Sequence, residues 1–354
     1  MLKEWRLLQT LSRGSLQALL LLSMGVRAHA QEAPGSAVSQ KQNKIILNSD
    51  LVVLPVTVKD GNGNLVAGMQ QEDFRVYDDK VEQTIDVFSA EGFPLSLVLL
   101  IDDDLKDDDA QQMVASLHSV LAGISPSDEA LVSTFDLKFS TVGDFTENPD
   151  RLFDNLLKAQ EASKPGHPML VPFVAGPSWH GLTPGEPTQA APTDLRSRPT
   201  KALDDAIYSA AELLKDRGRN RRKIILLVSD GINGLEFNHH KYEETIAALL
   251  AENVSVYSVA VGGTSFHKKF SRLLNYANDS GGDVYYAKKS EVMEKLYSQI
   301  TEQARYQYTL AYVPSGNNRD SNYHVVHVKA TRDGLYVKTR EGYYTKTFPD
   351  APAQ

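Results

Sequence analysis

Three continuous apolar runs constrain the fold of this chain more than any other feature of its sequence. They are Ser96–Ile101, Ile224–Ser229 and Val254–Val261. A run without alternation is typical of a strand that is buried on both faces. Segments with helical spacing of apolar residues separate these runs, so residues 93–303 are predicted to form a doubly wound, mostly parallel sheet.

The remaining elements of this α/β region follow the same alternation. Apolar residues at helical spacing predict helices near 113–124, 150–159, 203–214, 242–249, 270–277 and 292–300. Shorter apolar runs predict further strands at 130–135 and 284–286.

Period-two segments flank the α/β region on both sides. Residues 45–92 contain two strand-like pieces, and residues 304–346 alternate tyrosine or leucine with polar or small residues. Neither segment is large enough to bury a core by itself. We therefore expect the two segments to pair with each other, so that the α/β domain is an insertion in one small β-sandwich.

The first 30 residues have the pattern of a secretory signal. They start with basic residues, continue with a short apolar stretch and end in Ala28-His29-Ala30, which fits a small-x-small cleavage pattern. The apolar stretch is shorter than the ~20 residues that a membrane-spanning helix needs. We expect cleavage, a linker at 31–44, no transmembrane segment in the mature chain, and a periplasmic or secreted protein.

Net charge and residue composition disfavour some classes of binding partner and exclude some kinds of site. The formal net charge of −8 disfavours nucleic acid and broad anionic membrane surfaces as partners. The chain has no cysteine, which excludes disulfides, thiolate metal sites and cysteine nucleophiles. The basic run at 217–223 is expected to be a solvated helix end, and residues 347–354 are expected to be a tail.

A proline-rich segment interrupts the α/β pattern. Residues 163–199 hold half of the chain's 16 prolines and show no clear period. A structureless loop of this length is either functional or disordered. It carries Trp179, which is the only tryptophan besides Trp5. We interpret the loop as a partner-binding element, and the alternative is that Trp179 pins the loop to the domain surface.

Polar residues gather where the buried strands are predicted to end. Asp102 and Asp104 follow the first run, Asp230 follows the second, and Thr200 and Lys201 lead into the helix at 203. The carboxyl ends of the strands form the ligand-binding edge of a doubly wound sheet. Carboxylates gathered there would suit a hard cation such as Mg²⁺ or Ca²⁺.

This order of motifs resembles the von Willebrand factor type A (VWA) domain. The resemblance implies a metal-ion-dependent adhesion site (MIDAS), in which Asp-x-Ser-x-Ser, a Thr and a second Asp hold Mg²⁺ and a ligand carboxylate completes the shell. Residues 54–60, 72–76 and 340–344 look like flanking motifs of a secreted bacterial VWA-related family that is frequent in acidobacteria. The likeness extends over most of 45–346 and implies no particular biochemical function.

The sequence departs from the MIDAS motif at most of its positions. Asp102 and Asp230 match the two Asp positions, whereas Asp104 and Lys106 stand where the two Ser residues are expected. Lys201 stands at the Thr position. Two ammonium groups would then lie where a divalent ion should bind.

Two interpretations of this departure stay open. Thr200 stands one residue before the Thr position and could still serve a working divalent-cation site. Alternatively, the site is a remnant in which the ammonium groups of Lys106 and Lys201 pair with the carboxylates and replace the metal.

Three functions are compatible with these residues. The leading one is non-catalytic binding of a protein or cell-surface ligand outside the cytoplasm. A second is a metal-dependent phosphohydrolase of the haloacid-dehalogenase type, with Asp102 as nucleophile and Asp104 as general acid/base. The flanking β segments and the absence of a cap region argue against it. The third is a metal-free structural or assembly module.

Overall fold

The structure is a computed structural model. It describes residues 51–103, 105, 121, 123–162, 201–261, 271–286, 290–315 and 322–345. Some expectations fall on residues outside these ranges: the signal peptide and linker at 1–44, the proline-rich loop with Trp179, the tail at 347–354, and Asp104, Lys106 and Thr200. Within the described ranges, no helix has the length and apolar character needed to cross a bilayer.

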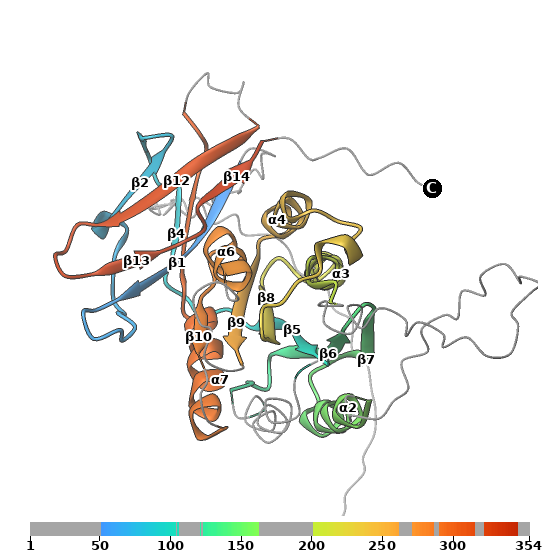
Figure 1. The fold of residues 1–354 in the computed structure, drawn as a ribbon. Coiled ribbons are helices and arrows are strands. Elements are labelled where there is room, and N and C mark those ends of the chain that lie inside the picture. Colours follow the sequence, from blue (N-terminus) through green and yellow to red (C-terminus); the bar gives the residue numbers. More distant parts are fainter. Residues whose placement is uncertain are drawn as a thin grey trace, which may run out of the picture. The chain divides into compact units, whose positions relative to one another are not determined.

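A six-stranded sheet forms the centre of the α/β domain, in the order β10-β9-β8-β5-β6-β7 (Figure 1). All neighbouring strands are parallel except β6 and β7, which are antiparallel. The strands are β5 (Leu95–Asp102), β6 (Glu129–Phe135), β7 (Phe139–Thr146), β8 (Arg222–Ser229), β9 (Val254–Ala260) and β10 (Val284–Tyr286).

Helices cover both faces of this sheet, as the buried character of β5 and β9 along their full lengths requires. Residues of α2 and α7 belong to the core on one face, and residues of α3, α4 and α6 belong to the core on the other. The prediction of a doubly wound, mostly parallel sheet is confirmed. The helices are α2 (Pro149–Ala162), α3 (Leu203–Lys215), α4 (Tyr242–Ala251), α6 (Ser271–Ser280) and α7 (Ser290–Arg305).

The segments on either side of the α/β domain form two four-stranded sheets, β13-β1-β11-β4 and β14-β12-β2-β3. N-terminal and C-terminal strands are neighbours in both: β1 pairs with β11 and β13, and β2 pairs with β12. The strands are β1 (Val52–Lys59), β2 (Phe74–Asp78), β3 (Val81–Gln83), β4 (Val87–Ser89), β11 (Tyr308–Tyr312), β12 (Tyr323–Ala330), β13 (Tyr336–Lys338) and β14 (Gly342–Tyr344).

Both sheets contribute to one apolar core. Leu54 and Val56 of β1, Phe74 of β2, Leu310 of β11 and Val328 of β12 are all buried in it. The two flanking segments therefore form one β-sandwich, and the α/β domain is inserted between β4 and β11, as the sequence predicts.

The expectation that the basic run at 217–223 is a solvated helix end was wrong for most of its basic side chains. Arg217 and Arg221 form ion pairs with Glu129 at 3.2 and 3.4 Å. Arg222 donates to the main-chain oxygen of Gln307 at 2.6 Å, and burial lowers its pKa to about 10. The run precedes and enters the buried strand β8, so most of its basic side chains bond to neighbouring elements, whereas Arg219 is exposed.

A polar contact joins the α/β domain to the sandwich. Asp283, which precedes β10, accepts hydrogen bonds from Lys59 of β1 and Lys338 of β13, each at 2.9 Å. Burial alone would raise the pKa of Asp283, but the two lysines outweigh it and lower that pKa.

We predict that Asp283→Asn lowers the free energy of unfolding by about 1–3 kcal/mol, because charged hydrogen bonds to both lysines are weakened. A carboxylate with a lowered folded pKa contributes stability above its unfolded pKa of about 3.9 and loses that contribution in acid. The difference between variant and wild type should therefore shrink as the pH falls from about 5 towards 3 in urea titrations. Asp216→Asn, at an exposed position, serves as the control. An equal loss at pH 7 and pH 3 would contradict this assignment.

Candidate functional site

The carboxyl edge of the central sheet brings together three of the residues singled out from the sequence. Asp102 is the last residue of β5, Asp230 follows β8, and Lys201 precedes α3. Strands β5 and β8 are parallel neighbours, so their last residues meet at one edge. The convergence follows from the topology of the sheet.

The ammonium of Lys201 lies between the two carboxylates. Its Nζ is 2.9 Å from Oδ2 of Asp102 and 3.0 Å from Oδ1 of Asp230. The Lys201 side chain is only 2% exposed, Asp102 is fully buried, and Asp230 is 18% exposed. Ser229, the last residue of β8, donates its hydroxyl to the same Oδ2 of Asp102 at 2.7 Å.

Burial and charge compete in this cluster. Burial raises the pKa of Asp102 to about 6, and the nearby charge of Lys201 opposes this shift. Burial likewise works to lower the pKa of Lys201, but the two carboxylates together outweigh it and raise that pKa. Lys201 therefore carries its positive charge at neutral pH, and the stability of the cluster depends on it.

These residues do not fit the divalent cation that the VWA resemblance implies. Mg²⁺ and Ca²⁺ bind carboxylate oxygens at about 2.0–2.6 Å. An ion placed between Asp102 and Asp230 would occupy the position of the Lys201 ammonium, and two cations so close would repel strongly. Both carboxylates already use an oxygen to accept from Nζ.

Main-chain hydrogen bonds hold the loops of this edge to one another. Ala202 donates its amide to the carbonyl of Asp136, which lies between β6 and β7, at 2.8 Å. Gly234, in the loop after β8, donates its amide to the carbonyl of Lys201 at 2.8 Å. Residues 201–202 are therefore held from both sides.

Gly231 shapes the start of the loop after β8. Its φ of 73° lies in the left-handed region, which glycine adopts without a steric penalty. This conformation lets its amide donate to the hydroxyl of Ser229 at 3.1 Å. Asp230, whose Oδ1 lies 3.0 Å from Nζ of Lys201, stands directly between these two hydrogen-bonded residues.

A pair of histidines, which the sequence analysis did not assign to any site, ties the far end of this loop to α3. Asp205 in the first turn of α3 accepts from Nδ1 of His239 at 2.8 Å and of His240 at 2.9 Å, and also from their main-chain amides. Burial would raise the pKa of Asp205, but these hydrogen bonds lower it. The ring of His240 stacks on Tyr208 at 3.7 Å.

Two leucines extend from the loops on either side of Lys201. Leu137 follows Asp136 and is 41% exposed, and Leu235 follows Gly234 and is 68% exposed. The edge of the sheet thus combines a closed polar centre with exposed apolar side chains.

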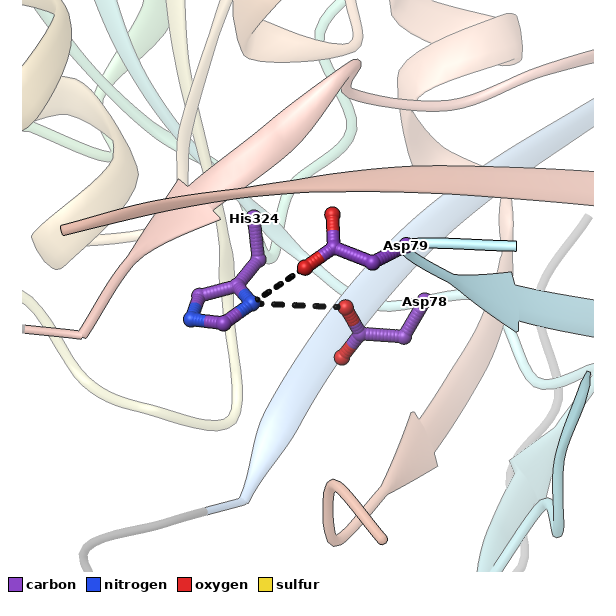
Figure 2. Close-up of side chains that lie close together, drawn as sticks. All are labelled: Asp78, Asp79 and His324. Carbon is purple, nitrogen blue, oxygen red and sulfur yellow. Dashed lines mark hydrogen bonds and ion pairs between the residues drawn. The ribbon is translucent and has the colours of Figure 1, made fainter. Parts of the chain in front are cut away.

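A second polar cluster lies in the sandwich and was not predicted. Figure 2 shows Asp78 and Asp79, at the end of β2, with their carboxylates directed at the ring of His324 in β12. Nδ1 of His324 lies 2.8 Å from Oδ2 of Asp79 and 3.7 Å from Oδ1 of Asp78. These side chains could supply ligands to a metal ion.

The sequence matches no family model and no curated protein. Solved structures with similarity to this chain include a von Willebrand factor type A protein from Catenulispora acidiphila, the manganese-loaded TRAP protein of Plasmodium vivax, and proximal thread matrix protein 1 of the mussel byssus with a zinc-occupied MIDAS motif.

The identities in these three comparisons are low. The Catenulispora protein is 12% identical, with a TM-score of 0.41 over 85% of this chain and 76% of its own. The Plasmodium protein is 12% identical, with a TM-score of 0.39 over 76% of this chain and 98% of its own. The mussel protein is 15% identical, with a TM-score of 0.41 over 64% of this chain, and this chain spans 49% of its length.

The assignment of the fold follows from the structure of this chain itself. The central sheet is parallel apart from one edge strand, has helices on both faces and presents Asp102 and Asp230 at its carboxyl edge. The chain is a VWA-like α/β domain inserted in a β-sandwich.

Proposed function

We propose that this chain is an exported, non-catalytic binding protein that uses the carboxyl edge of its VWA-like domain to bind a protein or cell-surface ligand. The ammonium of Lys201 takes the place of the divalent cation. One observation carries this proposal: Nζ of Lys201 lies within 3.0 Å of a carboxylate oxygen of both Asp102 and Asp230.

The arrangement of the sheet edge supports a binding role. Doubly wound sheets bind ligands at this edge. Residues 201–202 are hydrogen-bonded to Asp136 and Gly234, so this part of the edge is preorganised for a partner. Leu137 and Leu235 offer exposed apolar contacts beside the polar centre. The proline-rich loop with Trp179 precedes Lys201 in the chain, and we assign it to the same binding face.

The burial of Asp102 favours binding over phosphohydrolase chemistry. A nucleophilic carboxylate has to reach the substrate. Asp102 is fully buried, and its Oδ2 accepts from both Lys201 and Ser229. The same contacts argue against a metal ion whose coordination shell is completed by a carboxylate of the partner. In this proposal, the partner therefore contacts the loop surfaces around the cluster.

The first test removes the charge of Lys201. Lys201→Met should lower the free energy of unfolding at pH 7 by about 3–5 kcal/mol, because it leaves two carboxylates without their buried cation. The pKa of Asp102 is already raised by burial and should rise further in the variant. The variant should therefore recover stability relative to wild type as the pH falls from about 7 to 5, because Asp102 takes up a proton.

Lys138→Met is the matched control, since Lys138 is exposed on the neighbouring turn between β6 and β7. It should leave stability unchanged at both pH values in thermal and urea unfolding. A Lys201→Met protein as stable as wild type at pH 7 would show that the ammonium is not needed to balance the carboxylates.

The second test restores the family's residue at this position. Lys201→Thr removes the ammonium and supplies a hydroxyl beside Asp102 and Asp230, so the variant should gain measurable affinity for Mg²⁺ or Mn²⁺ in calorimetric titration. Chelator-treated wild-type protein should bind neither ion at this edge. Wild-type binding of Mg²⁺ that is lost in Asp230→Asn would refute the replacement of the metal.

The third test uses Trp179 as a reporter of the proline-rich loop. A partner-binding indole that is free in the unbound protein should emit at wavelengths typical of indole in water and be quenched efficiently by acrylamide. If Trp5 departs with the signal peptide, Trp179 is the only source of this emission in the mature chain. Blue-shifted, quencher-resistant emission would mean that the loop is pinned to the domain and would contradict its role as a free binding element.

A further inference from the structure

We propose that Asp78, Asp79 and His324 bind a divalent transition-metal ion of the Zn²⁺ class, and that this ion cross-links the N-terminal and C-terminal segments of the β-sandwich. The proposal is independent of the sheet-edge site and of the proposed binding function.

The spacing of the three side chains suits one small ion. One ligand atom from each residue lies within 4.8 Å of the other two, and Nδ1 of His324 is 2.8 Å from Oδ2 of Asp79. Ligand atoms around a Zn²⁺ ion, each at about 2.0–2.2 Å from it, are separated from one another by about 3–3.6 Å. Rotations that move the side-chain ends by about an ångström would complete the coordination.

Neighbouring residues hold each carboxylate so that one oxygen is left to face the ring (Figure 2). The hydroxyls of Tyr312 and Tyr343 donate to Oδ2 of Asp78 at 3.0 and 2.8 Å, which leaves Oδ1 on the side of His324. The amide of Val325 donates to Oδ1 of Asp79 at 3.0 Å, which leaves Oδ2 on that side. Such outer contacts are the usual means by which proteins orient metal ligands.

The ring of His324 is held by stacking and burial instead of by an outer hydrogen bond. It stacks on the ring of Tyr343 with centroids 5.1 Å apart, and its side chain is only 7% exposed. Nδ1 is aimed at the two carboxylates, and Nε2 is buried without a hydrogen-bond partner among the described residues. The imidazole thus offers Nδ1 as a buried ligand atom that is directed at two carboxylate oxygens.

The charge of the cluster favours a cation. Within the described part of the chain, His324 is the only basic side chain within ion-pair distance of Asp78 and Asp79. Nδ1 can donate one hydrogen bond, and Oδ1 of Asp78, at 3.7 Å, lies beyond hydrogen-bond distance. Two carboxylates therefore share one imidazole, and a divalent ion would balance their charge.

The donor set selects the class of ion. Imidazole nitrogen together with carboxylate oxygen suits Zn²⁺ and related transition metals, whereas Mg²⁺ and Ca²⁺ prefer oxygen alone. The side chain of Asp79 is 32% exposed, which gives an ion access from solvent and leaves room for water as a further ligand.

A metal at this position would join parts of the chain that are far apart in sequence. Asp79 and His324 are 245 residues apart and come from opposite sides of the inserted domain. With no cysteine in the chain, a disulfide cannot make this connection. An ion that binds only the folded state stabilises it by mass action.

The test is a calorimetric titration of Zn²⁺ into the full chain after chelator treatment, with thermal unfolding measured in parallel. Wild-type protein should bind one Zn²⁺ at this cluster, and its Tm should rise by about 5 °C when free Zn²⁺ is a hundredfold above Kd. Asp79→Asn should weaken binding by at least about tenfold. Asparagine tolerates the φ of 47° at this turn, so the variant should fold.

Control variants separate this cluster from other carboxylates. Glu82→Gln, on the adjacent strand β3, and Asp230→Asn, at the sheet edge, should keep the wild-type affinity for Zn²⁺. His324→Gln should abolish binding, and Asp79→Asn decides the question if the buried histidine variant fails to fold. Absence of Zn²⁺ binding by wild type, equal affinity in Asp79→Asn, or loss of binding in Asp230→Asn would each overturn the proposal.

Discussion

The pairing of β1 with β11 is the constraint on which the rest of the structure depends. It places Leu54 opposite Leu310. It also closes a sandwich whose N-terminal and C-terminal segments are separated in the sequence by the whole α/β domain. Because β11 also pairs with β4, the strands that precede and follow the inserted domain are direct neighbours. The ends of that domain are further joined where Phe93 donates its amide to the carbonyl of Arg305 at 3.3 Å, and where Arg305 forms an ion pair with Asp128.

The elements that could be predicted from the sequence are those whose burial requires a recognisable pattern of apolar residues. Strands β5, β8 and β9 are covered on both faces, so they require continuous apolar runs that identify them. Strand β7 was not predicted, because it is an antiparallel edge strand with most of its residues partly or fully exposed. An edge strand of this kind needs few apolar residues. The insertion in a sandwich could be inferred from the size of the flanking segments, whereas the register that joins Val326 to Asp78 could not.

The two polar clusters differ in how far the sequence could predict them. Asp102, Lys201 and Asp230 were expected to converge because parallel strand ends meet at one edge, and the sequence left open whether a metal ion or the ammonium groups of Lys106 and Lys201 balance the carboxylates. Nothing in the sequence links His324 to Asp78 and Asp79, because their proximity depends on the register of β2 and β12. The hydrogen bonds of Asp205 with His239 and His240 depend similarly on the path of a loop.

Both clusters contain neighbouring carboxylates that repel each other because their access to water is limited. At the sheet edge the countercharge is part of the chain, so it cannot dissociate, and the fully buried Asp102 is closed to an external ion. In the sandwich the two carboxylates face a single imidazole, and solvent can reach the carboxylate of Asp79. In the function that we propose, the covalently attached ammonium of Lys201 makes the first site independent of metal. In the sandwich, the proposed ion would exchange with solvent, and its effect would reach the α/β domain through the joined strands β4 and β11 and through the contacts of Asp283 with Lys59 and Lys338.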